Sequence, residues 1–204
     1  MAIKPILFNK QISTEMVRAI LDGRKSCTRR LVKPQPDEKH TFPLGFVTDS
    51  TEKKEVGCFG FGINEYGGSI QYAKPPYQPG DILYVRETWK KAPNGYYYYE
   101  DWQRNDIADV TKWHPSIHMP KEAARIWLKV TDVRVERLQD MDKMDAVKEG
   151  IDTRLCINLN HALAKFKKLW NSTIKKSDLD RYGWDANPYV WVIEFERCEK
   201  PEGV

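Results

Sequence analysis

The sequence predicts an α+β fold in which a small mixed β-barrel is flanked by helices. The predicted strands are separated by two or three helices, in an order that does not match repeated βαβ units. Residues 82–89 are apolar enough to form a strand that is buried on both faces. In residues 123–138 apolar and charged side chains alternate, and the alternation breaks near Thr131 and Asp132. Such a break is typical of a β-bulge, which lets a long strand bend into a barrel.

The other elements follow from apolar spacing and turn signals. Residues 3–8 predict a first strand, in which Pro5 requires an edge position or the strand start. Residues 37–55 are polar and charged and are expected to form a mobile surface loop. Glycines 67 and 68 predict a hairpin turn, and the aromatic residues beside it are expected to form the hairpin's own small core. Further expected elements are helices at 14–22, at about 141–149 and from Asn158 or Asn160 onwards, and strands at 96–99 and 189–196.

Length and composition favour one domain that folds alone. The chain has 204 residues, of which 41% are hydrophobic, and this is enough to bury a core. No apolar run approaches the roughly 20 residues of a membrane span. The N-terminus lacks the pattern of a signal peptide, so a cytoplasmic protein without membrane contact is expected. The four cysteines stand singly, which predicts reduced thiols and no zinc ribbon. Neither a metal nor a cofactor is expected, and the sequence does not indicate an oligomeric state.

Positive charge is concentrated near the N-terminus. The whole chain carries a net charge of +4, but its first 36 residues contain eight Lys or Arg and only two acidic residues. Such a region attracts a phosphate-bearing ligand, or a polyanion such as RNA or DNA, to one end of the molecule. A solvated basic face that binds nothing explains the same pattern.

The most chemically dense stretch is Leu-Asp-Gly-Arg-Lys-Ser-Cys-Thr-Arg-Arg at residues 21–30. Apolar residues at helical spacing precede it, which predicts a helix that ends on Gly23 in the left-handed conformation. If the chain continues as a strand, its side chains alternate between two faces. A bend at Lys25 then brings its side chain to those of Thr28 and Arg30. A helix cap followed by a solvated basic strand is the alternative.

The spacing Gly23-x-Lys25-x-x-Thr28-x-Arg30 resembles the signature of the ASCH domain, a branch of the PUA-like small β-barrels associated with RNA and modified nucleosides. Gly-Asp before residues 82–89 and Arg-Glu-x-Trp at their end are also similar to that pattern. Most ASCH proteins carry Glu at the position of Thr28. The branch with Thr resembles the small N4-acetylcytidine amidohydrolases, in which the motif lysine and threonine are catalytic together with a later glutamate. Glu149, in Asp-Ala-Val-Lys-Glu-Gly, matches that glutamate.

The resemblance implies a single PUA-like domain over residues 1–204, with insertions at about 37–78 and 90–122. Residues 113–120 are similar to phage and prophage proteins of this type. The implied substrate is an acylated cytosine in a nucleoside, RNA or DNA. Two alternatives stay open, a non-catalytic PUA-like module that binds RNA, DNA or a modified base, and an ASCH ribonuclease.

The three matched residues suit amide hydrolysis. A lysine whose pKa is lowered by burial among cations can take the proton of the Thr28 hydroxyl, which then attacks the acyl carbon. Glu149 would position or deprotonate water, or pass a proton to the leaving amine. Arg30 or a backbone N–H would stabilise the oxyanion. The cations expected around Lys25 and the substrate are those of Arg24, Arg29 and Arg30.

Five further residues are expected to contact the substrate. Arg86 and Glu87 lie at the end of a predicted strand, where pocket residues are common, although a structural ion pair is the alternative. A proline-stiffened loop presents the other three, which suit stacking and hydrogen bonding on a flat ring, although a packed lid is the alternative: Trp113, Ser116 and His118. Pro115 makes a helical two-histidine metal site in this loop implausible.

Overall fold

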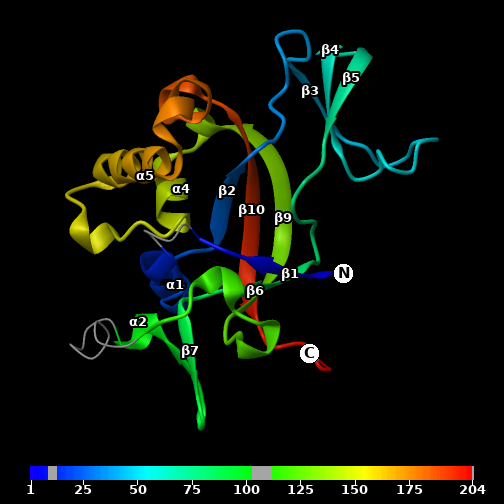
Figure 1. Cartoon of the computed structure of the whole chain (residues 1–204). Helices are drawn as coiled ribbons and strands as arrows, with labels where there is room; N and C mark the ends of the chain where they lie inside the picture. The colour runs from blue at the N-terminus through cyan, green and yellow to red at the C-terminus, as the bar shows by residue number, and fades with distance from the viewer. Residues whose placement is uncertain (9–12, 103–111, 204) are drawn as a thin grey trace.

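A five-stranded mixed sheet with the strand order β1-β6-β9-β10-β2 forms the centre of the molecule (Figure 1). The computed structural model describes residues 1–8, 13–102 and 112–203. β1 pairs with β6 in parallel, and the other neighbours are antiparallel. The α+β class, with a mixed sheet and flanking helices, is therefore confirmed. The five strands are β1 (Ile3–Ile6), β2 (Cys27–Leu31), β6 (Ile82–Val85), β9 (Trp127–Arg137) and β10 (Tyr189–Cys198).

The sheet bends at a bulge in its two longest strands. Glu194 of β10 lies opposite Asp132 of β9, but the next residue, Phe195, lies opposite Val130. Thr131 is therefore the extra residue, and the bulge predicted from the break in alternation is confirmed. Pro5 also lies where the sequence requires it, because β1 is an edge strand.

One face of the sheet carries the main core together with helix α1 (Ser13–Leu21). Trp191 and Ile193 of β10 belong to this core, and their partners on β2 are Arg30 and Thr28. Because opposite residues of paired strands point to the same face, Thr28 and Arg30 face the side of the main core.

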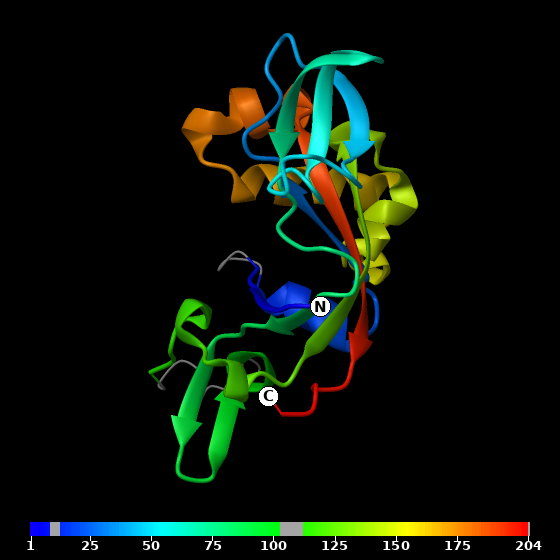
Figure 2. The same ribbon diagram turned by 90° about the vertical axis from the view of Figure 1, so that its right-hand side faces the viewer.

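A separate three-stranded sheet covers one end of this core (Figure 2). It consists of β3 (Phe42–Phe46), β4 (Phe59–Asn64) and β5 (Gly67–Ala73). The expectation of a loop throughout 37–55 is wrong, because the apolar segment of β3 pairs with β4. The expectation of a small separate core is also wrong, because Phe59 and Phe61 pack with Trp191 and Tyr189 of the main sheet.

The opposite face of the main sheet is covered near β2 by helices α4 (Lys143–Lys148) and α5 (Leu159–Thr173). Val190 and Val192 of β10 pack in this second core. Asn158 begins α5, since its side chain accepts a hydrogen bond from the backbone N–H of His161 at 3.0 Å. Of the two caps predicted for this helix, Asn158 is the one used.

The predicted strand at 82–89 is divided in two, because β6 ends at Val85 and β7 begins at Trp89. β7 (Trp89–Ala92) and β8 (Gly95–Tyr98) form a hairpin at the end of the molecule opposite β3–β5 (Figure 2). That 37–78 and 90–122 are insertions in a smaller domain stays a prediction. The remaining helices among the described residues are α2 (Tyr99–Trp102), α6 (Leu179–Tyr182) and the 3₁₀ segments Ser116–His118, Lys121–Ala123, Leu138–Asp140, Thr153–Leu155, Lys176–Asp178 and Trp184–Ala186.

Helix α1 ends in a Schellman motif, as the glycine predicts. Gly23 has a φ of 71° and donates its N–H to Ile20 O at 3.0 Å, while Arg24 N–H donates to Ala19 O at 2.8 Å. Lys25 N–H donates to the same Ala19 carbonyl at 2.9 Å. The backbone before β2 is thus fixed to the end of α1, and this fixes the position of the Lys25 side chain.

The end of α4 docks on this fixed segment. Ser26 N–H donates to Lys148 O, and Arg24 Nη1 donates to Gly150 O, both at 2.9 Å. Gly150 has a φ of 102°, and a Cβ atom there would lie 2.9 Å from the Cβ of Ala19 and 3.2 Å from that of Lys25. Only glycine satisfies both the backbone angle and the close approach.

Gly150→Ala is expected to lower the free energy of unfolding by about 2 to 4 kcal/mol, since the left-handed φ and the overlap both oppose it. The matched control is Gly23→Ala, because Gly23 also has a positive φ, but a Cβ atom there would have no neighbour within 4 Å. The control is expected to lose only about 1 to 2 kcal/mol. Urea unfolding measures both, and equal losses would contradict the close docking of α4 on the segment before β2.

Candidate active site

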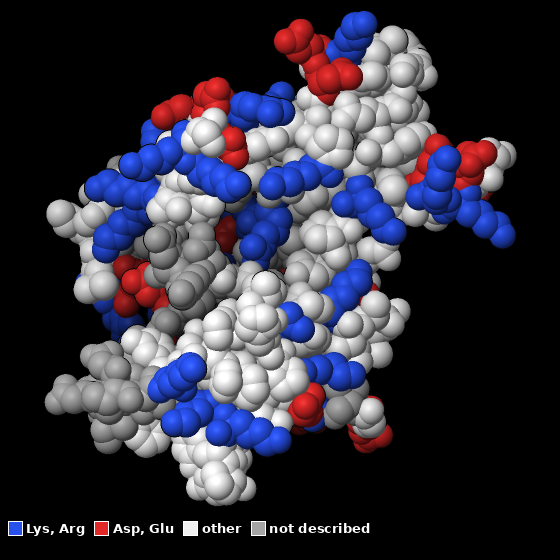
Figure 3. Space-filling model, in the orientation of Figure 1, with Lys and Arg blue, Asp and Glu red and all other residues white. Residues whose placement is uncertain are grey.

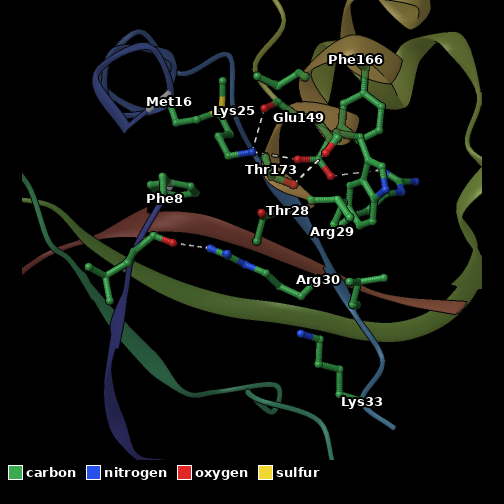
Figure 4. Close-up of a pocket in the computed structure, with 15 residues that line it drawn as sticks. Phe8, Met16, Lys25, Thr28, Arg29, Arg30, Lys33, Glu149, Phe166 and Thr173 are labelled. Atoms are coloured by element: carbon green, nitrogen blue, oxygen red, sulfur yellow. Dashed lines mark hydrogen bonds and ion pairs between the residues drawn. The ribbon is translucent and has the colours of Figure 1, made fainter. Parts of the chain in front are cut away.

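A cavity of about 520 Å³ lies along the outer edge of β2 (Figure 4). Lys25, Thr28 and Glu149 all line it, although Glu149 is separated from the other two by more than a hundred residues. The structure therefore brings the three predicted catalytic residues to one wall. They are also buried, with 4% of Lys25, 4% of Thr28 and 5% of Glu149 exposed.

Lys25 and Glu149 form a buried ion pair. Lys25 Nζ donates to Glu149 Oε2 at 2.9 Å, to the Glu149 backbone carbonyl at 2.7 Å and to Cys27 O at 2.8 Å. Three acceptors match the three hydrogens of an ammonium group. Lys25 is expected to lie among cations, but the nearest charged group to its Nζ is the Glu149 carboxylate.

Arg29 is bound on the other side of the same carboxylate. Its side chain is fully buried, and its guanidinium lies 2.8 Å from Asp145, 3.3 Å from Glu136 and 3.5 Å from Glu149. Glu149 caps the C-terminal end of α4, where the helix dipole disfavours a negative charge. Lys25 and Arg29 offset that effect, which explains why a glutamate is stable at this position.

Thr28 presents a hydroxyl without a hydrogen-bond partner among the described residues. Figure 4 shows this hydroxyl directed into the cavity, between Lys25 and Arg30. Its neighbours therefore leave it free for a ligand. Lys25, which is expected to take the proton of this hydroxyl, donates its three hydrogens to Cys27 O, Glu149 O and Glu149 Oε2 instead.

The backbone of β2 also faces the cavity. Phe195 N–H donates to Ser26 O, and Val32 N–H donates to Tyr189 O, so even-numbered residues of this segment bond to β10. The N–H and C=O groups of Cys27, Arg29 and Leu31 consequently point to the outer edge, where Cys27 O accepts from Lys25. Arg29 and Leu31 line the cavity and thus supply backbone donors and acceptors at its wall.

Arg30 closes the side of the cavity opposite Lys25. Its Nη2 donates to Leu7 O, which follows β1, and its guanidinium lies 5.8 Å from the centre of the Phe8 ring. Lys25 Nζ lies 5.5 Å from the same ring. Arg30 thereby joins the two edges of the main sheet through a side chain and is held in place for a ligand.

The other residues predicted to bind substrate do not line this cavity. Arg24 bonds to Gly150 O and Asp22. Arg86 and Glu87 do not pair with each other: Arg86 donates to Ile117 O, and Glu87 pairs with Arg125 at 2.8 Å. Burial raises the pKa of Glu87 despite that partner.

The predicted proline-stiffened loop lies near the β7–β8 hairpin. The Trp113 ring packs edge-on against Tyr99, with centroids 5.5 Å apart, and Ser116 and His118 lie in a 3₁₀ segment. Ligand contact by these three residues, and by Arg24, Arg86 and Glu87, stays a prediction that this cavity does not support.

Sequence reasoning missed the aromatic side of the cavity. Phe166 and Trp170 of α5 line it together with Phe8, whereas the apolar stripe of α5 predicted only a scaffold helix. It also missed Asp145 as the partner of Arg29. Asp145 stands four residues before Glu149, a spacing that places two side chains on one side of a helical turn, and this was the available signal.

Within residues 1–8, 13–102 and 112–203, no helix is long and apolar enough to cross a membrane. In the same part of the chain, no group of three or more His, Cys, Asp and Glu side chains is arranged to hold a metal ion.

Comparisons with known proteins find two solved structures that are similar to this chain. One is an ASCH domain from Lactobacillus crispatus, with a TM-score of 0.46, 10% identity and coverage of 96% of this chain and 79% of that one. The other is a protein from Enterococcus faecalis of the family DUF984, with a TM-score of 0.41, 9% identity and coverage of 100% and 84%. No family model and no curated protein matches the sequence. At these TM-scores any assignment of function rests on the residues of the cavity.

Removing one member of the Lys25–Glu149 pair is expected to cost about 3 to 5 kcal/mol, because the other charge is left buried without its partner. Lys25→Met and Glu149→Gln test this by urea unfolding. The double variant is expected to lose less than the sum of the single losses, since no unpaired charge remains from the pair. Additive losses would contradict a direct coupling between the two side chains.

Cys27 is expected to be unreactive in the folded protein. Burial, followed by the nearby Glu149 carboxylate, raises the pKa of its thiol from 9.0 to about 12. The folded state therefore favours the neutral thiol, and the stability gained from this is present below pH 9.0 and lost as the pH rises towards about 12. Iodoacetamide at about pH 8 should label the half-buried Cys156 long before Cys27, as read by mass spectrometry. Equal labelling of the two thiols would contradict the burial of Cys27.

Proposed function

We propose that this chain is an ASCH-type amidohydrolase that removes the acyl group from an acylated cytosine. The supporting observation is that Lys25, Thr28 and Glu149, which the resemblance matches to catalytic residues, line one cavity. Its volume of about 520 Å³ falls within the usual range for a small-molecule site. Thr28 is the nucleophile, and the Lys25–Glu149 pair acts as general base and general acid.

The ion pair provides a route for those protons. A proton passes from the Lys25 ammonium to the Glu149 carboxylate, 2.9 Å away, and leaves an amine beside a carboxylic acid. The amine takes the Thr28 hydroxyl proton while the oxygen bonds to the acyl carbon. The C–N bond breaks, and Glu149 gives its proton to the leaving amine. Water, deprotonated by Glu149, then cleaves the Thr28 ester and releases the acid, while Lys25 returns a proton to the Thr28 oxygen. Glu149 finally gives its proton back to Lys25, which restores the ion pair.

The walls of the cavity supply the other requirements of this reaction. The oxyanion would be stabilised by the Arg30 guanidinium or by an outward N–H of β2, both of which are fixed before substrate binds. The rings of Phe8, Phe166 and Trp170 offer apolar faces for a base. The backbone donors and acceptors of Arg29 and Leu31 would hydrogen-bond to its edge.

A second candidate is a PUA-like module that binds the same base without turnover. It is favoured by the saturation of Lys25 Nζ with three acceptors and by the lack of a hydrogen bond from Thr28 to Lys25. The ribonuclease alternative is less well supported, because the charge of Lys25 that would stabilise a cleaved phosphate is already paired with Glu149.

The hydroxyl of Thr28 separates the two candidates. N4-acetylcytidine is incubated with the parent, Thr28→Ser and Thr28→Val, and cytidine is measured by chromatography. The parent should release cytidine, Thr28→Ser should retain part of the rate, and Thr28→Val should lose about 10³-fold or more because it keeps the shape but lacks the nucleophile.

Binding of cytidine to the same variants, measured by calorimetry, is the control and should change little. No release of acetate from any acylated cytosine by the parent, with binding retained, would exclude hydrolysis and favour the binding module. A Thr28→Val variant as active as the parent would exclude Thr28 as the nucleophile.

A further inference from the structure

A second hollow adjoins the candidate active site. It has a volume of about 400 Å³ and shares four wall residues with the first cavity: Leu7, Arg30, Leu31 and Lys33. Its remaining wall includes Lys74 and Tyr77, which follow β5, and Trp191 of β10. The face that contains both hollows carries Lys and Arg side chains around a central depression (Figure 3). A ligand that fills the first cavity can therefore extend into the second past Arg30.

The second hollow is positively charged without compensation. Arg30, Lys33 and Lys74 line it, and no described Asp or Glu does. Among the described residues, no carboxylate lies within 4.0 Å of the charged nitrogens of these three side chains. Lys25 and Arg29 differ in this respect, because carboxylates neutralise both. The three uncompensated charges therefore remain available to an anion.

The three cations differ in how firmly their side chains are held. Arg30 is held by Leu7 O and the Phe8 ring at the boundary of the two hollows, so its planar fork is fixed before an anion arrives. Lys33 and Lys74 are exposed and act as point charges further out. Tyr77 donates its hydroxyl to Pro5 O at 2.9 Å, which holds its ring as part of the wall. A fixed guanidinium beside two lysines suits a phosphate group.

We propose that this second hollow is a phosphate subsite, and that the ligand is a nucleotide whose phosphate contacts Arg30, Lys33 and Lys74. That the base enters the first cavity rests on the proposed function, whereas the phosphate contact rests on the uncompensated charges alone. The phosphate belongs either to a mononucleotide or to a single-stranded nucleic acid. Free nucleoside fills only the first cavity and is the weaker ligand.

Calorimetry at low salt tests the subsite with cytidine, cytidine 5′-monophosphate, cytidine 3′-monophosphate and a five-nucleotide oligocytidine. At least one phosphate-bearing ligand should bind about tenfold or more tightly than cytidine, and this advantage should shrink as salt rises. Lys33→Gln with Lys74→Gln should remove most of the advantage. Lys74→Gln alone, at a residue that lines only the second hollow, should remove part of it and leave cytidine binding unchanged. The matched control, Lys53→Gln with Lys54→Gln, removes the same charge from residues outside both hollows. This control should keep the tighter binding of the phosphate-bearing ligands.

The ligand series also identifies the source of the phosphate. A mononucleotide that binds as tightly as the oligonucleotide indicates a nucleotide site, and a tighter oligonucleotide indicates a strand. Equal binding of cytidine and all phosphate-bearing ligands, no binding of any of them, or equal losses in the two double variants would each overturn the subsite. These outcomes do not depend on hydrolysis, so a protein that binds nucleotide but releases no acetate would refute the proposed function and keep the subsite.

Discussion

The buried ion pair between Lys25 and Glu149 is the interaction on which the candidate site depends. It connects the segment after α1 to the end of α4, which are also joined by the hydrogen bond from Ser26 N–H to Lys148 O and by the close approach at Gly150. In a nearly dry position each charge is costly without the other. The pair therefore stabilises the fold whether or not it moves protons, and an enzyme and a binding protein would both need it. The free Thr28 hydroxyl beside it is the feature that a purely structural role does not explain.

Strand β2 brings the elements of the site together because it is both an edge strand and the continuation of the motif. Its even-numbered residues bond to β10 and send Thr28 and Arg30 to the side of the main core. Its odd-numbered residues send Arg29 to the carboxylates and turn backbone groups to the cavity. An exposed strand edge ordinarily invites pairing with another chain. Here the Lys25 ammonium donates a hydrogen bond to Cys27 O, and helix α5 forms the far wall of the cavity. The other backbone groups at this edge therefore face a confined space suited to a small planar ligand.

Much of this arrangement is local enough to be predicted from sequence. The glycine that ends α1, the bulge at Thr131, the cap of α5 and the convergence of Lys25, Thr28 and Glu149 each follow from a short pattern or a motif. The partners of charged side chains are different, because they come from distant elements. Glu87 pairs with Arg125 rather than with its neighbour Arg86, and no spacing in the sequence indicates that choice. For the same reason the sequence predicts a small local core for the aromatic residues of β4, which in fact pack on β10 across the molecule.

The N-terminal cations fall into two groups, those paired with carboxylates and those without such a partner. The sequence shows them as one basic block, but strand alternation separates Arg29, which is neutralised by carboxylates, from Arg30, which is not. Because Lys25 is neutralised as well, the innermost part of the cavity carries little net positive charge, and the uncompensated charges lie further out at Arg30, Lys33 and Lys74. A phosphate is thus attracted to the outer hollow and away from Lys25, where it would compete with Glu149 for the ammonium group. The separation allows one ligand to be held by its phosphate while the Lys25–Glu149 pair stays intact beside Thr28.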